Sequence, residues 1–131
     1  VTGTLRSNLL YGVRRRVSDQ ELIGLLELFG MSSFLSRLKG GLQSRVEFNG
    51  SSVSQGEAQR IALIRAVASR PSLLLLDEAT AHVDNETEDL IIKALRQLLP
   101  SSTIIMVTHR ERLVSLVDQR FILEEGKLKS A

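Results

Sequence analysis

Two pairs of polar residues each follow directly on an apolar run, and their residue types could do chemistry. A run of four leucines is closed by Asp77-Glu78, and a second apolar run is closed by Thr108-His109. In open α/β sheets, ligands bind outside the carboxyl ends of the strands, so reactive groups are expected at such positions. Asp77 could hold Mg²⁺ through its water shell, Glu78 could orient or deprotonate a water, and His109 could stabilise a phosphate in the same space.

Each of these residues also has a purely structural interpretation. A leucine run in a buried strand is part of the core, an Asp-Glu pair is often a helix N-cap, and a histidine at a strand end is usually satisfied by hydrogen bonds. A chemical role therefore depends on whether the fold brings these residues together.

A helix N-terminus at Ser54 offers a different chemistry, the binding of an anion. Ser54 and Glu57 have the spacing of a capping box, and the apolar spacing that follows predicts a helix to about Ser69, with Pro71 beyond its end. Backbone N–H groups and the helix dipole favour anions at such an end. The hydroxyl of Ser54 and the glycine at Gly56 allow close approach.

The elements that position these residues alternate between strand and helix. Ser72 to Asp77 and Thr103 to Thr108 are apolar runs of strand length, which predict strands buried on both faces of a parallel sheet. Asn85 to Leu99 has helical spacing between them. A short helix over Glu111 to Val117 and a third strand over Phe121 to Leu123 complete a βαβ pattern, so we expect a parallel sheet.

The part of the chain before these elements is predicted to be helical. Ser18 and Glu21 have capping-box spacing, and the helix that begins there ends at Gly30. A short helix follows, and Gly40 to Ser52 has the composition of a loop.

Length and composition limit the possible classes of protein. The 131 residues are 43% hydrophobic and 24% charged, which fits one globular domain that can bury a core. The absence of cysteine excludes disulfides, thiol catalysis and thiolate metal sites. A net charge of +2 gives no electrostatic reason to expect nucleic acid, and we interpret Arg14-Arg15-Arg16 as a solvated face or loop. The longest apolar runs are far short of the roughly 18 residues of a membrane-spanning helix.

Three stretches, in this order and at this spacing, resemble the ATP-binding cassette (ABC) ATPase family. Val53 to Leu63 is similar to its signature motif, Leu73 to Asp84 to its Walker B strand and D-loop, and Val107 to Arg110 to its switch histidine. Two further segments are similar to exporter-type members, Gly3 to Leu9 and Gly126 to Leu128. The resemblance therefore covers nearly the whole chain.

The resemblance implies a P-loop NTPase-like α/β fold in two parts. Residues 1–70 would be the helical signature subdomain with its following helix, and residues 71–131 the carboxyl-terminal part of the RecA-like catalytic core. The sequence contains no G-x-x-x-x-G-K-[ST] motif, so it lacks the lysine and backbone nest that hold the β and γ phosphates. We expect the chain to be a fragment without the Walker A and Q-loop part, and to be inactive alone.

The resemblance also implies a role for particular residues. Glu78 would polarise the attacking water, His109 would contact the γ-phosphate, and Asp77 would help to hold Mg²⁺. ATP held by a partner subunit would be contacted from the signature motif and the D-loop, by Ser54, Gln55, Gly56, Glu57 and Asp84.

Three positions depart from the family pattern. Gln55 stands in place of a glycine and could restrict approach to phosphate, Glu57 stands in place of glutamine and adds negative charge near ATP, and His82 replaces a small residue. We interpret the changes at Gln55 and Glu57 as tuning of the site rather than its loss.

The function that the resemblance implies is ATP binding and hydrolysis that powers transmembrane export, with ATP and Mg²⁺ as cofactors. The implied partners are a second nucleotide-binding domain in a head-to-tail dimer and a transmembrane domain, on the cytoplasmic face of the inner membrane. The segment Glu47 to Ser51 stands where exporters carry a loop near the transmembrane coupling helices. The altered signature leaves open a non-hydrolytic, regulatory nucleotide-binding half. Chromosome-maintenance and DNA-repair ATPases share these motifs, but they carry coiled coils and basic surfaces that this sequence does not show, so no nucleic acid is expected.

Overall fold

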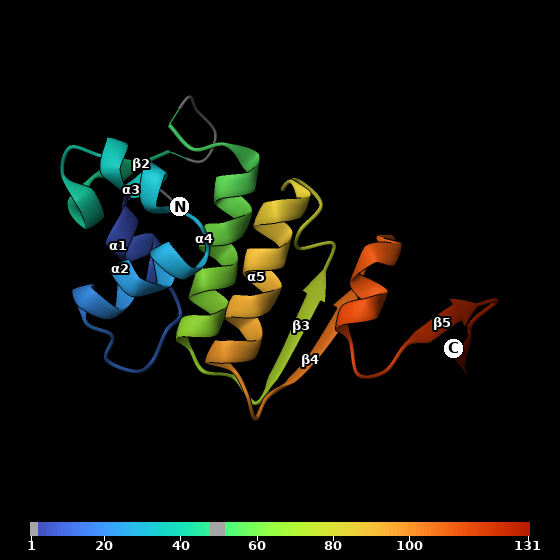
Figure 1. The fold of residues 1–131 in the computed structure, drawn as a ribbon. Coiled ribbons are helices and arrows are strands. Elements are labelled where there is room, and N and C mark those ends of the chain that lie inside the picture. The colour runs from blue at the N-terminus through green and yellow to red at the C-terminus, as the bar shows by residue number, and fades with distance from the viewer. Residues whose placement is uncertain (1–2, 48–51) are drawn as a thin grey trace.

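The computed structural model describes residues 3–47 and 52–131. Figure 1 shows a helical first half on one side and a pair of strands on the other, with helices α4 (Gln55–Ala68) and α5 (Asn85–Leu98) drawn between them. Buried apolar side chains from Leu5 to Leu113 belong to one cluster, which includes residues of both halves. Helices α4 and α5 therefore connect the two halves through the core.

The helical first half contains the two predicted helices in their predicted order, together with four short elements that were not predicted. The predicted helices are α2 (Asp19–Leu28) and α3 (Ser32–Arg37), and the other elements are β1 (Gly3–Thr4), α1 (Leu5–Leu9), the 3-10 turn η1 (Gly41–Gln43) and β2 (Arg45–Val46). Strands β1 and β2 form a short antiparallel pair, and β2 lies inside the segment whose composition predicts a loop. Two residues are too short to leave a periodic pattern in a sequence.

Helix α2 begins and ends where the sequence indicates, but its cap differs in detail. The Ser18 hydroxyl accepts a hydrogen bond from the Glu21 N–H at 3.1 Å. The Glu21 carboxylate pairs with Arg15 and so does not close the predicted capping box. Gly30 follows the helix with a φ of +66°, a conformation that glycine adopts without strain.

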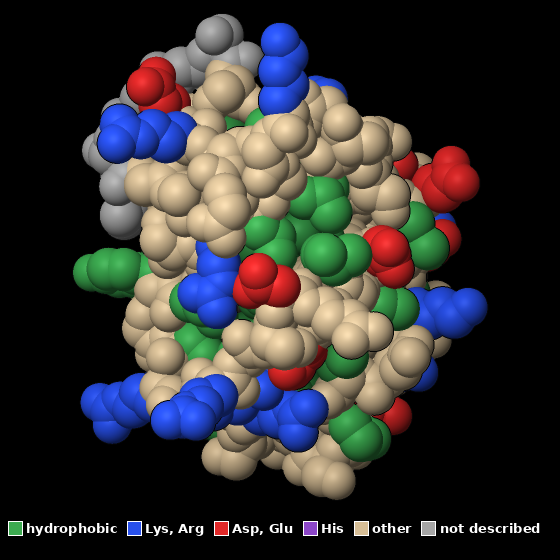
Figure 2. Space-filling model, turned by 90° about the vertical axis from the view of Figure 1, so that its left-hand side faces the viewer, with side chains coloured by type: hydrophobic (Ala, Val, Ile, Leu, Met, Phe, Trp, Pro, Cys, Tyr) green, Lys and Arg blue, Asp and Glu red, His purple; other side chains and the backbone are tan. Residues whose placement is uncertain are grey.

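The run Arg14-Arg15-Arg16 lies in the loop between α1 and α2, one of its two predicted settings, but its middle residue is only half-exposed. Arg14 and Arg16 are exposed, whereas Arg15 donates to the carbonyl of Ala68 at the end of α4 and pairs with Glu21 of α2. Figure 2 shows the outer face of the helical half, where Lys and Arg share the surface with carboxylates and apolar side chains.

The second half is built on the predicted parallel pair. Strands β3 (Leu73–Asp77) and β4 (Thr103–Val107) run parallel, with Asp77 paired to Val107 at their carboxyl ends. Helix α5 connects them, which confirms the β-α-β order. Because the register is unbroken, the residues that follow each strand emerge at the same edge of the sheet.

One face of this pair is open, so the prediction of strands buried on both faces is wrong for this chain. Leu74 and Leu76 are buried, but Leu75 is 66% exposed and Val107 is 56% exposed. Successive side chains of a strand point to opposite faces, so α4, α5 and their neighbours cover one face only.

The predicted third parallel strand is also wrong. Strand β5 (Phe121–Glu124) pairs with β6 (Lys127–Ser130) in an antiparallel hairpin, apart from the β3–β4 pair. The turn between them is Glu125-Gly126, and both residues have positive φ, the backbone of a type I′ hairpin turn. The segment before β5 is a 3-10 helix, η2 (Glu111–Leu116), which lies where a short helix is predicted.

Among residues 3–47 and 52–131, no helix is long and apolar enough to cross a membrane.

Candidate functional site

The edge at which β3 and β4 end carries Glu78 and His109 side by side. Glu78 follows β3, and its N–H donates to the Val107 carbonyl at 3.0 Å, which extends the sheet by one bond. The His109 Nε2 lies 3.5 Å from the Glu78 Oε1. The His109 side chain is 95% exposed and so is accessible to a ligand. The parallel register therefore brings together two of the residues predicted to be catalytic.

The Glu78 side chain has an oxygen, Oε1, whose contact with an ionisable partner in the described residues is the 3.5 Å approach of His109. Its Oε1 is shielded from solvent and makes no hydrogen bond within the described part of the chain. Its backbone φ is +47°, an uncommon conformation for a residue other than glycine. The Glu78 side chain as a whole is 40% exposed, so a water can approach the carboxylate from solvent and give it a proton.

Asp77 ends β3 with an exposed carboxylate. Across residues 3–47 and 52–131, no group of three or more His, Asp or Glu side chains could hold a metal ion. Asp77 would thus be a single protein ligand for Mg²⁺. One or two carboxylates are what Mg²⁺ takes from a protein when waters and phosphate oxygens fill its other positions, so this donor set fits that ion.

The N-terminus of α4 is closed by the predicted capping box. The Ser54 hydroxyl accepts from the Glu57 N–H at 3.3 Å, and the Glu57 Oε2 accepts from the Ser54 N–H at 2.8 Å. These two bonds leave the N–H groups of Gln55 and Gly56 without an intrahelical acceptor, as donors at the positive end of the helix dipole. The predicted capping box is confirmed, and the N–H groups of Gln55 and Gly56 remain available to an anion.

The carboxylate of Glu57 is turned inward rather than toward a ligand. It is buried, and it pairs with Arg37 of α3 at 2.8 Å. Burial works to raise the pKa of Glu57, but hydrogen bonds from Ser54 and Arg37 outweigh burial, so the pKa lies below its ordinary value. The Arg37 guanidinium therefore offsets the negative charge that the sequence adds at this position.

The ion pair of Glu57 predicts a pH-dependent contribution to stability. Because the folded-state pKa is lowered, the stabilisation is present above the ordinary value of 4.5 and is lost as the pH falls through the folded-state pKa. Glutamine can fill the same capping box, so Glu57→Gln removes only the charge. We expect Glu57→Gln to lower the free energy of unfolding by up to about 1 kcal/mol at pH 7, with the difference vanishing in acid.

Urea denaturation at a series of pH values measures this effect. Glu27→Gln changes an exposed carboxylate on α2 and serves as the matched control. A difference for Glu57→Gln that persists unchanged to pH 3 would contradict the assigned ion pair.

Asp84 caps helix α5. Its Oδ1 accepts from the Thr87 N–H at 2.9 Å, and its Oδ2 accepts from the Thr87 hydroxyl at 3.0 Å. These hydrogen bonds, the one from the Thr87 N–H first, lower the pKa of Asp84. The residue that caps a helix here is therefore Asp84, and not the Asp77-Glu78 pair. Asp84 is also exposed to solvent. Its predicted contact across a dimer interface stays a prediction.

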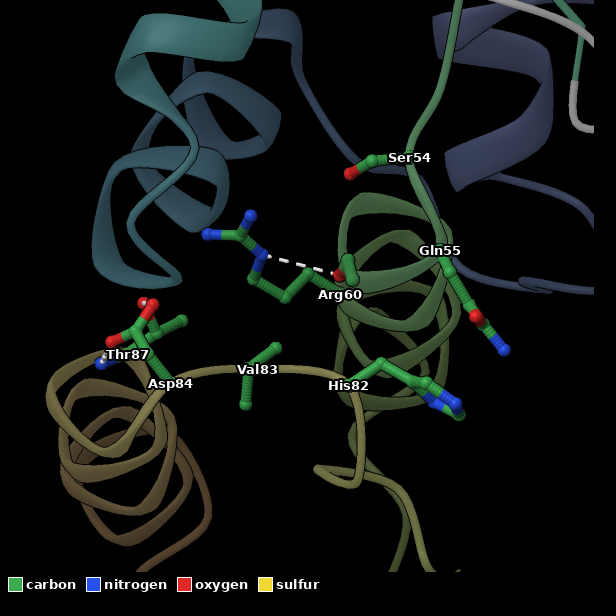
Figure 3. A pocket seen from close by; sticks show the side chains of 8 residues that line it. Ser54, Gln55, Arg60, His82, Val83, Asp84 and Thr87 are labelled. Atoms are coloured by element: carbon green, nitrogen blue, oxygen red, sulfur yellow. Dashed lines mark hydrogen bonds between the residues drawn. The ribbon is translucent and has the colours of Figure 1, made fainter.

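A pocket of about 410 Å³ lies between the start of α4 and the loop before α5. Ser54 to Gly56 and Arg60 line one side, and His82 to Asp84 with Thr87 line the other. Figure 3 shows Ser54 and Gln55 at the helix start and His82, Val83 and Asp84 along the facing loop. The signature-like residues and the D-loop-like residues therefore belong to one site, although they are far apart in the sequence.

Gly56 is glycine because the facing loop comes too close for a side chain. A Cβ atom at Gly56 would lie 2.7 Å from the carbonyl oxygen of His82, closer than non-bonded atoms approach. A glycine at position 56 is therefore explained by the close approach of the facing backbone, in addition to the close approach of a phosphate that the sequence suggests.

Sequence reasoning missed Gln59, which joins α4 to the facing loop. The His82 N–H donates to the Gln59 Oε1 at 3.2 Å, and the Gln59 Nε2 lies 3.0 Å from the His82 Nδ1. No sequence signal identifies this contact, because both side chains are polar and neither lies on an apolar face.

Glu88 and Arg110 were also missed as partners. The Arg110 Nη1 lies 3.0 Å from the Glu88 Oε1, and the Glu88 side chain is fully buried. A signal for Glu88 did exist, because it shares the helical spacing of Ile91, Ile92 and Leu95, which are buried. A charged residue on an apolar face indicates a buried pair.

The fold and the site together define a mixed α/β domain with acidic residues at the end of strand β3, and the comparisons that follow place it in the P-loop NTPase-like class. The family model described as ABC transporter matches residues 3–81, which is more than half of the chain. The chain therefore belongs to the ABC transporter family, through its ATP-binding domain.

The curated relatives that the chain matches include ABC transporter proteins of several bacteria. An uncharacterised ABC transporter ATP-binding protein of Bacillus subtilis, YfiC, is 39% identical over 126 residues, which is 96% of this chain and 21% of that protein. A multidrug resistance ABC transporter ATP-binding and permease protein of Lactococcus lactis is 34% identical over 98% of this chain and 22% of its own length. An ATP-dependent lipid A-core flippase of Xylella fastidiosa is 34% identical over 96% of this chain and 21% of its own length.

A solved structure agrees with these relatives. A bacterial Atm1-family ABC exporter with ATP bound matches with a TM-score of 0.83 and 32% identity, over 96% of this chain and 22% of that one. The chain thus spans about a fifth of the length of the curated relatives it matches.

Proposed function

We propose that this chain is the ATP-hydrolysing part of a nucleotide-binding domain in an exporter-type ABC transporter. The observation that carries the proposal is the contact between Glu78 and His109 at the shared carboxyl edge of two parallel strands, 3.5 Å apart. Phosphoryl transfer to water needs a group that positions the water and a group that contacts the phosphate. Glu78 would do the first and His109 the second.

The remaining site residues would bind the nucleotide and its ion. Asp77 would hold Mg²⁺, which when bound neutralises charge on the phosphates. Ser54, Gln55 and Gly56 would donate to the γ-phosphate of ATP on a second nucleotide-binding domain, with Glu57 ordering the helix start. Asp84 would meet that second domain. This arrangement needs a head-to-tail dimer, which is part of the proposal.

The whole transporter would contain further parts. We propose a division at residue 70, with the signature subdomain before it and the carboxyl-terminal part of the RecA-like catalytic core after it. The exposed apolar face of β3 and β4 favours additional core structure packed there. We further propose a transmembrane domain as a partner and a location on the cytoplasmic face of the membrane. The Glu47 to Ser51 segment assigned to that contact lies mostly outside the described residues.

ATP hydrolysis by the intact protein tests the function. We expect Mg²⁺-dependent release of phosphate from the protein in detergent or in liposomes, with a chelator as the control. An intact protein that binds ATP but releases no phosphate would instead support the regulatory, non-hydrolytic half.

Titration of the isolated chain with Mg-ATP tests its expected inactivity. The sequence has no phosphate-binding lysine motif, so we expect binding no tighter than about millimolar, or roughly 4 kcal/mol. Isothermal titration calorimetry measures this, with Asp77→Asn as a comparison. A micromolar Kd would contradict the fragment interpretation.

A further inference from the structure

The guanidinium of Arg110 reaches from the strand end that carries His109 into the loop before α5. Its Nη2 donates to the Ala81 carbonyl at 3.1 Å and to the Val83 carbonyl at 3.2 Å. A guanidinium is planar and holds its donors in a fixed arrangement. These two bonds tie the loop to the strand end that carries His109.

The other edge of the same guanidinium faces Glu88. The Nη1 of Arg110 is 3.0 Å from the Glu88 Oε1, and the carboxylate is completely buried in the first turns of α5. None of the roles proposed for hydrolysis uses this carboxylate. Within a buried ion pair, the cost of removing both charges from water offsets their attraction. The pair with Glu88 therefore serves mainly to orient the Arg110 guanidinium.

The loop is also held by Gln59 of α4. The two contacts between Gln59 and His82, at 3.2 Å and 3.0 Å, join the loop to the helix start that carries the signature-like residues. Arg110 thus binds Ala81 and Val83, and Gln59 binds His82, the residue between them.

We propose that Arg110 is a positioning residue that couples the His109 strand end to the loop of residues 81–84, with Glu88 as its anchor. Through this loop and Gln59, the coupling extends to the start of α4. The strand edge with His109, the loop of residues 81–84 and the helix start at Ser54 would then keep fixed positions relative to one another. The catalytic consequence rests on the proposed function, whereas the coupling itself does not.

Amide hydrogen exchange of the 131-residue chain, followed by NMR, tests the coupling directly. The N–H groups of Ala81, His82 and Val83 donate to Glu78, Gln59 and Thr80, so each amide reports on the loop. Arg110→Lys keeps a positive charge facing Glu88, but one ammonium cannot reproduce the fork to both carbonyls. We expect these three amides to exchange about tenfold faster or more, because bonds from a charged donor are lost.

The matched control is Arg112→Lys. Arg112 also ties its segment to α5, by donating to the Asn85 carbonyl at 3.0 Å and by pairing with Asp89, but it makes no hydrogen bond to the loop of residues 81–84 in the described structure. We expect this variant to leave the three loop amides unchanged. Unchanged exchange in Arg110→Lys, or equal acceleration throughout the chain, would overturn the proposal.

A second variant covers the case in which Arg110→Lys does not fold. Glu88→Gln keeps the shape of the side chain and removes the anchoring charge, so it should accelerate the same three amides, and the same two outcomes would count against the proposal.

In the intact protein, Arg110→Lys should lower kcat for ATP at least several-fold with KM unchanged, whereas a merely structural defect would reduce activity and folded fraction together. A wild-type protein without hydrolysis would reject the proposed function and leave the exchange result to decide the coupling.

Discussion

Replacing Glu78 with glutamine in the intact protein should lower kcat for ATP hydrolysis by about 100-fold or more, the contribution expected of a general base. Glutamine has the same shape but cannot take a proton from water. Glutamine also accepts the same backbone conformation, so the hydrogen bond from residue 78 to the Val107 carbonyl and the sheet edge should survive. Steady-state phosphate release measures kcat, and equilibrium binding of Mg-ATP should stay within about twofold, because the change affects the reacting water and not the nucleotide contacts.

Two comparisons make this result specific. Glu27→Gln changes an exposed carboxylate on α2 and should leave turnover unchanged. Single-turnover measurements separate the chemical step from product release. If Glu78→Gln hydrolyses ATP at a rate within about threefold of wild type, Glu78 is not the base.

Replacing Gly56 with alanine should lower the free energy of unfolding of the chain by about 1–3 kcal/mol, the range for a forced overlap in a packed region. The added Cβ would lie 2.7 Å from the His82 carbonyl oxygen, and the contact is with backbone, which cannot rotate away. Either the start of α4 or the facing loop must move. In the intact protein we expect a loss of ATP hydrolysis as well, because both segments line the same pocket.

The chain offers a matched control in Gly24→Ala. Gly24 also lies inside a helix, α2, but a Cβ there would meet nothing within 4 Å. Alanine should therefore stabilise that helix by about 0.5–1 kcal/mol, from its higher helix propensity. Urea denaturation of both variants compares the two glycines. Equal midpoints for Gly56→Ala and wild type would show that α4 and the loop approach less closely than the structure has them.

Local signals predicted most of the helices and the parallel pair. The capping box at Ser54 and Glu57 depends on residues three positions apart, and the strand that ends at Asp77 is a short apolar run. Interactions of this kind are local, so a single stretch of sequence contains them. The same reasoning failed for β5, because a strand pattern does not say which strand is its partner.

Part of the candidate site is also predictable from local sequence. The sequence shows Asp77, Glu78 and His109 at the ends of predicted strands, where ligands bind in α/β sheets. It also shows a helix start at Ser54, where backbone N–H groups favour an anion. The open face of β3 and β4 was not predictable. An apolar run predicts that a strand is covered, but it does not identify the segment that covers each face.

The sequence by itself therefore determined which residue types stand at the ends of these elements: an acidic pair after a leucine strand, a histidine after a second strand and a capping box at a helix start. The tertiary structure alone decided which of these residues meet. It placed Glu78 beside His109 through the register of β3 and β4, faced Gly56 with the His82 carbonyl, and joined Arg110 to Glu88. The physical reason is that these contacts link residues far apart in the chain, and their distances depend on how helices and strands pack rather than on any local pattern.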